Sequence, residues 1–307
     1  MYSEEVSPVV REQDKVSFVS INEGGFKWDN YDSELGLRNI NVDLKPQQLS
    51  LIVGSRDSGK SSLLHAILGE MFLATGNLVV RGRIAFVADT PWLQNSSIRD
   101  NILSGLDYSV DSYEKTVLGC GLVKDFLLLD VCCIISVALF NFFFLFLQSG
   151  DAEIVGVSGI KISESLKQRI CLARGVYAML SNNADILILD DPLTAVESLL
   201  ARRIVQDCIN KTLRNRTRII STSQLALFLP ESQNVVVMNN GLVAEQGHHS
   251  VLTRQDGVLS DMLRNVKMFA ANAEDDDEDH SDDEEVTIFF YFVVPCLYKK
   301  KKKKKNH

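Results

Sequence analysis

The feature that most constrains this chain is the segment Gly54–Ser61, GSRDSGKS, which fits the pattern G-x-x-x-x-G-K-[ST]. It follows the apolar run Leu49–Val53 and precedes a stretch with helical character, Lys60–Met71. Between a buried strand and a helix, the backbone N–H groups of such a loop can wrap a phosphate group. We therefore predict a nucleotide site rather than a glycine-rich turn without a ligand. The predicted nucleotide-binding residues in and beside the loop are Gly54, Ser55, Arg56, Asp57, Ser58, Gly59, Lys60, Ser61 and Ser62.

The site is predicted to hold ATP together with Mg²⁺. Lys60 is expected to contact the β- and γ-phosphates, and the Ser61 hydroxyl is expected to bind the metal. A second metal contact is expected where the later apolar run Ala184–Asp190 ends, because Asp190 would hold Mg²⁺ through water. The alternative is that Asp190 and Asp191 only cap the following turn.

Short apolar runs alternate with helical segments along most of the chain, which is typical of a mostly parallel sheet covered on both faces. These runs are Val16–Ile21, Leu49–Val53, Ala184–Asp190, Thr217–Thr222 and Asn234–Met238. The prediction is an α/β fold with a P-loop core.

The charge distribution argues against nucleic acid as a partner. The formal net charge of −8 includes ten acidic residues in Glu274–Glu285 and seven lysines in Lys299–Lys305. The rest of the chain is still acidic, whereas nucleic-acid-binding domains are usually basic.

Several motifs in the right order resemble the nucleotide-binding domains of ABC transporters, most closely the first such domain of subfamily C, the multidrug-resistance-associated type. The matching segments are Gly25–Trp28, Pro91–Leu103, Lys167–Arg174, Asp190–Glu197 and Gly241–Gly247. The resemblance implies an ABC ATPase core with an antiparallel β subdomain and a helical signature subdomain. It also implies that Trp28 stacks on adenine.

Two segments depart from the family pattern at residues that would contact the nucleotide. The Q-loop glutamine falls on Asp89, a shorter and charged residue that could still bind Mg²⁺. The signature L-S-G-G-Q falls on Ile162–Leu166, ISESL, so that Ser163, Glu164 and Ser165 stand where the family loop faces the γ-phosphate across a head-to-tail dimer. A carboxylate at Glu164 would repel the phosphates there.

The two remaining departures concern hydrolysis. The glutamate that orients water in the family falls on Asp191, and the switch histidine falls on Ser223. Serine cannot act as a general base near neutral pH. Asp191, Ser223 and Asp89 are thus the candidate catalytic positions, and we expect ATP binding with impaired hydrolysis.

The leading functional hypothesis is an ATP-binding domain that couples ATP binding or hydrolysis to transmembrane transport. Its implied partners are a second nucleotide-binding domain and transmembrane domains, and as part of a transporter its implied place is the cytoplasmic face of a membrane. The sequence itself contains no convincing transmembrane helix. The alternatives are a non-catalytic regulatory ATP-binding module or a decayed fragment. A third is a soluble ABC protein of translation or DNA repair, which Trp28 and Pro91–Leu103 argue against.

One apolar block, residues 131–148, interrupts the resemblance, and its removal restores the family spacing. The block corresponds to 18 whole codons, so translation would read through it. Its first residue, valine, has codons that begin with GT, and its last, glutamine, can be encoded by CAG, so the coding sequence could begin and end as an intron does. We favour a retained intron over a membrane span or a genuine soluble insertion. The predicted organisation is a linker at 1–15, the nucleotide-binding domain at 16–270, an acidic linker at 271–285 and a non-native or disordered tail at 286–307.

Overall fold

The computed structural model describes residues 10–12, 18–29, 34–129, 150–156 and 162–271. The chain divides into two compact units, Met1–Met262 and Leu263–His307. The following description concerns the first. The predicted linkers, tail and apolar block at 1–15, 131–148, 271–285 and 286–307 lie almost wholly outside the described residues.

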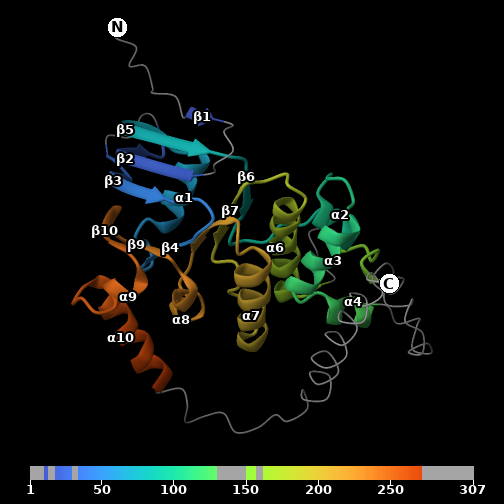
Figure 1. The fold of residues 1–307 in the computed structure, drawn as a ribbon. Coiled ribbons are helices and arrows are strands. Elements are labelled where there is room, and N and C mark those ends of the chain that lie inside the picture. The colour runs from blue at the N-terminus through green and yellow to red at the C-terminus, as the bar shows by residue number, and fades with distance from the viewer. Residues whose placement is uncertain (1–9, 13–17, 30–33, 130–149, 157–161, 272–307) are drawn as a thin grey trace, which may run out of the picture. The chain divides into compact units, whose positions relative to one another are not determined.

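The first unit is built on two sheets, and the larger has the predicted parallel core (Figure 1). Its order is β10-β9-β4-β8-β7-β6, with neighbours parallel except at the β10–β9 edge. Its strands are β4 (Leu49–Gly54), β6 (Ile84–Val87), β7 (Ile186–Asp190), β8 (Thr217–Ser221), β9 (Asn234–Asn239) and β10 (Leu242–Gly247). Residues in β4, β7 and β8 are all buried, as expected for a sheet covered on both faces.

The smaller sheet has the order β1-β5-β2-β3 and is antiparallel apart from the β1–β5 pair. Its strands are β1 (Val10–Glu12), β2 (Phe18–Lys27), β3 (Leu37–Leu44) and β5 (Phe72–Arg81). Strand β2 extends well past the predicted end at Ile21, because two register shifts near Gly24 and Gly25 let it continue. This sheet is the predicted antiparallel subdomain.

Helix α1 (Lys60–Leu68) packs between the two sheets. Its buried Leu63, Leu64 and Ile67 join side chains of the small sheet and one face of the parallel sheet in a single apolar cluster. The helix ends earlier than predicted, because Gly69 adopts a left-handed conformation with φ of 82° and caps the carbonyls of His65 and Ala66.

The helical part of the unit packs around the long helix α6, and Figure 1 shows α2, α3 and α4 grouped beside it. Its helices are α2 (Ile98–Leu103), α3 (Val110–Gly119), α4 (Val123–Leu129) and α6 (Glu164–Leu180). The remaining helices are α7 (Ser198–Ile204), the π-helix η2 (Val205–Thr212), α8 (Leu225–Phe228), the 3₁₀ turn η3 (Leu229–Glu231), α9 (His249–Leu252) and α10 (Val258–Ala271). No helix among the described residues is long and apolar enough to cross a membrane.

The described residues on either side of the apolar block are anchored close together. Before the block, Asp125 on α4 forms an ion pair with the buried Arg169, at 2.5 and 2.9 Å. After it, the fully buried Asp151 accepts hydrogen bonds from Arg99, at 2.7 and 2.9 Å, and from the Tyr113 hydroxyl at 2.7 Å. Both flanks of the block are therefore held by charged contacts to described residues of the domain.

The approach of the two flanks is closest at Gly150. A Cβ atom there would lie 2.2 Å from the carbonyl oxygen of Phe126, so only glycine fits. The backbone on both sides of the block meets at this point, and a short connection would close the gap.

We predict that deleting residues 131–148 leaves a chain that folds. The shortened chain should match the full chain in thermal stability and exceed it in solubility, because an apolar run of 18 residues is removed. Circular dichroism melting and soluble yield measure both quantities. In the shortened chain Asp151→Asn should lower the free energy of unfolding by about 2 kcal/mol, because the neutral amide bonds less strongly to the partly exposed Arg99 guanidinium than the carboxylate does. Failure of the shortened chain to fold would show that the block is an integral part of the domain.

Candidate functional site

The glycine-rich loop lies at the carboxyl end of β4 and opens directly into α1, as predicted. Gly54 is the last residue of β4, and Gly59, with φ of 101°, precedes the first helical residue, Lys60. Asp57 also has a positive φ of 60°, which aspartate tolerates better than most residues. Positive φ values at Asp57 and Gly59 are typical of loops that can direct backbone N–H groups at an anion.

The amino group of Lys60 lies over this loop. Its Nζ donates to the carbonyl oxygens of Gly54 at 3.1 Å and Ser55 at 2.8 Å. The ammonium is therefore held at the mouth of the loop without a carboxylate partner among the described residues. The Ser58 hydroxyl, which is buried in the loop, likewise has no hydrogen-bond partner in the described part of the chain. Both observations suit a loop that receives an anion.

A turn from the other end of the domain supports the loop. Gly241, in the turn between β9 and β10, donates to the Ser58 carbonyl at 3.0 Å and accepts from the Arg38 amide at 2.9 Å. A Cβ at Gly241 would lie 2.4 Å from the Gly36 carbonyl oxygen, so this turn requires glycine. The sequence placed Gly241 in a closing hairpin, but its contact with the loop is visible only in the fold.

Three carboxylates gather at the same edge of the sheet. Asp190, the last residue of β7, is only 6% exposed. Burial is the main cause of the raised pKa of its carboxyl group, a hydrogen bond from Ser61 acts in the opposite direction, and the charges of Asp191 and Asp89 raise it further. The structure thus brings together Ser61, Asp190 and Asp89, the three predicted metal ligands.

Asp191 and Ser223 contact each other directly. The Asp191 carboxylate accepts from the Ser223 amide at 2.8 Å and from its hydroxyl at 3.1 Å. The Asp191 amide in turn donates to the carbonyl of Ser221, the last residue of β8, at 2.9 Å. The two departures that concern hydrolysis therefore form one hydrogen-bonded pair across neighbouring strand ends.

Trp28 lies beside the first turns of α1. Its indole is 50% exposed, and its ring centroid is 5.5 Å from that of His65, which in turn approaches Phe86 at 6.1 Å. An exposed aromatic face near a phosphate-binding loop is suited to stacking on a base. Sequence reasoning did not predict His65 as the support for Trp28, although it lies five residues after Lys60 on the same helix.

The predicted signature residues lie at the start of α6. Ser163 caps the helix by accepting from the Leu166 amide at 3.2 Å, and the first-turn Glu164 forms an ion pair with Lys167 at 2.9 Å. The side chain of Glu164 is 62% exposed. In the described residues the hydrogen bonds of this segment stay within α6, so the structure does not join Ser163, Glu164 and Ser165 to the loop at Gly54–Ser61.

Gln168, which sequence reasoning missed, links α6 to the edge of the sheet where the predicted metal ligands lie. Gln168 is 6% exposed and bonds Thr194 and Ala195, shortly after Asp191, at 2.7 and 2.8 Å. A polar residue within an otherwise buried helix stretch was the available signal. Through these hydrogen bonds of Gln168, a shift of α6 would move the segment after Asp191.

Comparisons with known proteins identify the family of this chain. The profile of the family described as ABC transporter matches residues 37–194. ATP-binding cassette sub-family C member 2 of Mus musculus is 36% identical over 253 residues, which are 82% of this chain and 15% of that protein. ABC transporter C family member 9 of Arabidopsis thaliana is 37% identical over 238 residues, which are 78% of this chain and 14% of that protein. The chain thus spans about a seventh of the length of these relatives, and it belongs to the ABC transporter family as an ATP-binding domain of the subfamily C type.

Proposed function

We propose that this chain binds MgATP as the nucleotide-binding part of a subfamily C-like transporter at the cytoplasmic face of a membrane. The observation that supports this most directly is the loop Gly54–Ser61, with the Lys60 ammonium at its mouth and Ser61 beside the buried Asp190. The proposed nucleotide contacts are the loop and Trp28. The proposed partners are a second nucleotide-binding domain and transmembrane domains, as the names of the relatives suggest.

The donor set suits Mg²⁺ held jointly with phosphate oxygens. Among the described residues no group of three or more histidine, cysteine or acidic side chains is arranged to hold a metal ion alone. Mg²⁺ in nucleotide sites is usually held by one or two protein ligands with substrate phosphates and water. Ser61 and Asp190 would hold it, with Asp89 nearby, and the positive charge of the ion would offset the burial of the Asp190 carboxylate, which is the main cause of its raised pKa. When bound, Mg²⁺ would stabilise negative charge on the transferred phosphoryl group.

We further propose that turnover is slow. Asp191 is shorter than the family's glutamate, and its carboxylate is engaged by Ser223 rather than by an imidazole. In a head-to-tail dimer, Glu164 would face the γ-phosphate of the ATP bound by the partner domain. The ion pair of Glu164 with Lys167 would offset part of its negative charge. The chain would then act mainly by closing a dimer when ATP binds.

The two tryptophans of the chain allow a direct test of nucleotide binding. Trp28 and Trp92 are 50% and 56% exposed, and Trp92 packs on Arg174 at 4.4 Å. Adding MgATP should quench intrinsic fluorescence in the wild type and in Trp92→Phe, but not in Trp28→Phe. In the Trp92→Phe background, Lys60→Ala should weaken the affinity for MgATP by about tenfold or more, because a charge-assisted phosphate contact is lost. Equal quenching in both single-tryptophan variants would contradict the proposed base contact.

Asp190→Asn should have opposite effects on the stability of the chain and on its metal-dependent binding of ATP. Because folding raises the Asp190 pKa, the charged carboxylate destabilises the folded state above its ordinary pKa, and this cost disappears as pH falls below that value. The amide should therefore raise the melting temperature of the nucleotide-free chain at pH 7 but not at pH 3.5. It should also weaken Mg²⁺-dependent ATP binding by about tenfold or more. A lower melting temperature at pH 7 would show that the carboxylate stabilises the fold.

Turnover is tested by steady-state ATPase assays of the chain alone and mixed with a hydrolysis-competent nucleotide-binding domain. We expect little phosphate release by the chain alone, and an increase in the mixture with Glu164→Gln, because one negative charge is removed beside the partner's phosphates.

The matched control is Asp111→Asn, since Asp111 is also an exposed first-turn carboxylate paired with a lysine, Lys115. It should leave the rate unchanged. Vigorous turnover by the chain alone that Lys60→Ala abolishes would overturn the proposal of slow hydrolysis.

A further inference from the structure

A polar cavity of 580 Å³ lies at the opposite edge of the parallel sheet from the glycine-rich loop. Arg218, near the start of β8, pairs in register with Leu49 at the start of β4, whereas the loop begins where β4 ends. The cavity and the proposed ATP site are thus separated by the length of the strands.

All nine residues that line the cavity are polar or charged. Five carry amide side chains, three are the cations Lys211, Arg214 and Arg218, and the single carboxylate is Glu231. Lys211 also pairs with Asp207 at 2.5 Å outside the lining set. Sites for drug-like ligands are mostly apolar, so a lining of amides and cations points to a small hydrophilic anion.

Arg218 gives the cavity a buried positive charge. It is 3% exposed, and its guanidinium donates to the carbonyls of Ile209 at 2.7 Å, Arg214 at 3.2 Å and Arg216 at 3.0 Å. In the described part of the chain no carboxylate lies within ion-pair distance of it. Burial lowers its pKa to about 10, so it remains charged at neutral pH. A guanidinium has five N–H groups, so donors remain for a ligand, and an unpaired buried charge is costly.

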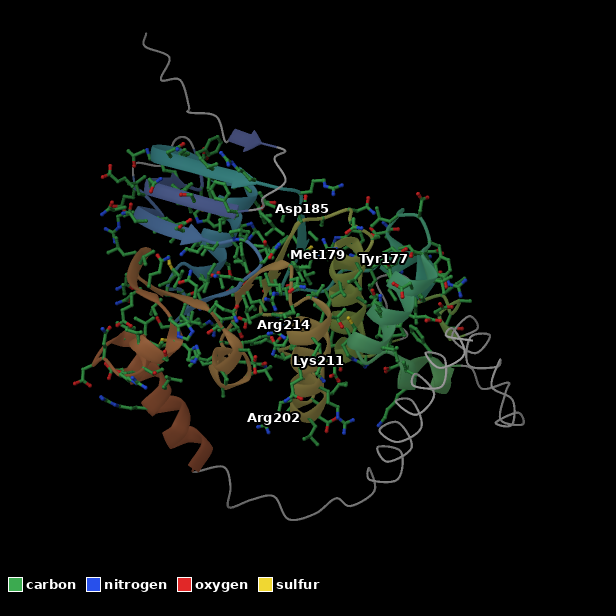
Figure 2. The ribbon with its side chains drawn as sticks, viewed as in Figure 1. Tyr177, Met179, Asp185, Arg202, Lys211 and Arg214 are labelled. Atoms are coloured by element: carbon green, nitrogen blue, oxygen red, sulfur yellow. The ribbon has the colours of Figure 1, made fainter. Side chains whose placement is uncertain are left out.

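The cavity wall is a π-helix. Gln206, Asn210 and Lys211 lie on η2, and Arg218 caps the carbonyl of Ile209 in the same helix. Such helices are rare and frequently mark functional sites. Figure 2 shows Lys211 and Arg214 along the helical stretch that begins as α7 and continues as η2, together with Arg202 on α7.

We propose that this cavity is a second anion site, which binds a small phosphate-bearing molecule through Arg214 and Arg218 with hydrogen bonds from the surrounding amides. It is independent of the proposed ATP site. The volume accommodates a molecule the size of a short polyphosphate or a phosphorylated metabolite.

The test uses inorganic pyrophosphate as the probe and the full chain with Lys60→Ala, so that binding at the glycine-rich loop is suppressed. Isothermal titration calorimetry should detect binding that weakens between low and high salt. Arg214→Gln should reduce the affinity by about tenfold, because one charge-assisted contact is lost. Asn210→Asp, which is isosteric and adds a negative charge to the wall, should reduce it at least as much.

Arg202→Gln is the matched control, because it removes the same charge from an exposed arginine on α7 that does not line the cavity. The affinity of this variant for pyrophosphate should stay within about twofold of that of the Lys60→Ala chain. In a chain with Lys60 intact, Arg214→Gln should leave the quenching of Trp28 by MgATP unchanged, which keeps the two proposals distinguishable. Equal affinity in the Arg214→Gln and Arg202→Gln chains, or no binding at all, would overturn the second site. Arg214-dependent binding of a glutamate-rich peptide without pyrophosphate binding would overturn the small-phosphate assignment.

Discussion

The whole arrangement depends on β4, a fully buried strand hydrogen-bonded on both sides. It pairs in parallel with β8 and β9, and its carboxyl end fixes the position of Gly54. Because parallel neighbours end at the same edge, this one constraint brings the loop, Asp190 at the end of β7 and Ser223 after β8 into a single region. A shift in the register of β4 would disperse the site without changing any of its residues.

Two of the departures from the family pattern are connected directly by the fold. Asp191 and Ser223, each shorter than its family counterpart, hydrogen-bond to each other at 2.8 and 3.1 Å. The two substitutions are thus structurally compatible, and the strand ends stay joined although the imidazole is absent. At α6, Ser163 still caps the helix, so the change at Glu164 alters charge while the helix start is retained. The domain keeps its architecture while its proposed chemistry changes.

Local patterns predicted the elements well where side-chain periodicity alone decides them. The loop at Gly54–Ser61, the parallel core and the hairpin ending at Gly247 all rest on short segments whose physics is local. The boundaries were less predictable. Helix α1 ended early because Gly69 adopts φ of 82°, and β2 ran on because register shifts absorbed the Gly24–Gly25 pair. Both outcomes depend on the neighbours that these residues meet.

The sequence by itself determined that this chain has a phosphate-binding loop in an α/β core, because the spacing of glycines, lysine and serine between a buried run and a helix carries that chemistry within eight residues. Only the tertiary structure decided which distant groups complete the site, namely His65 beneath Trp28, Gly241 against the loop and Gln168 beside the segment after Asp191. It also decided that the Arg218 guanidinium is buried, with backbone carbonyls as partners and no carboxylate within ion-pair distance in the described part of the chain. The reason is that such contacts join residues up to nearly 200 positions apart, and their geometry is set by how the sheets and helices pack.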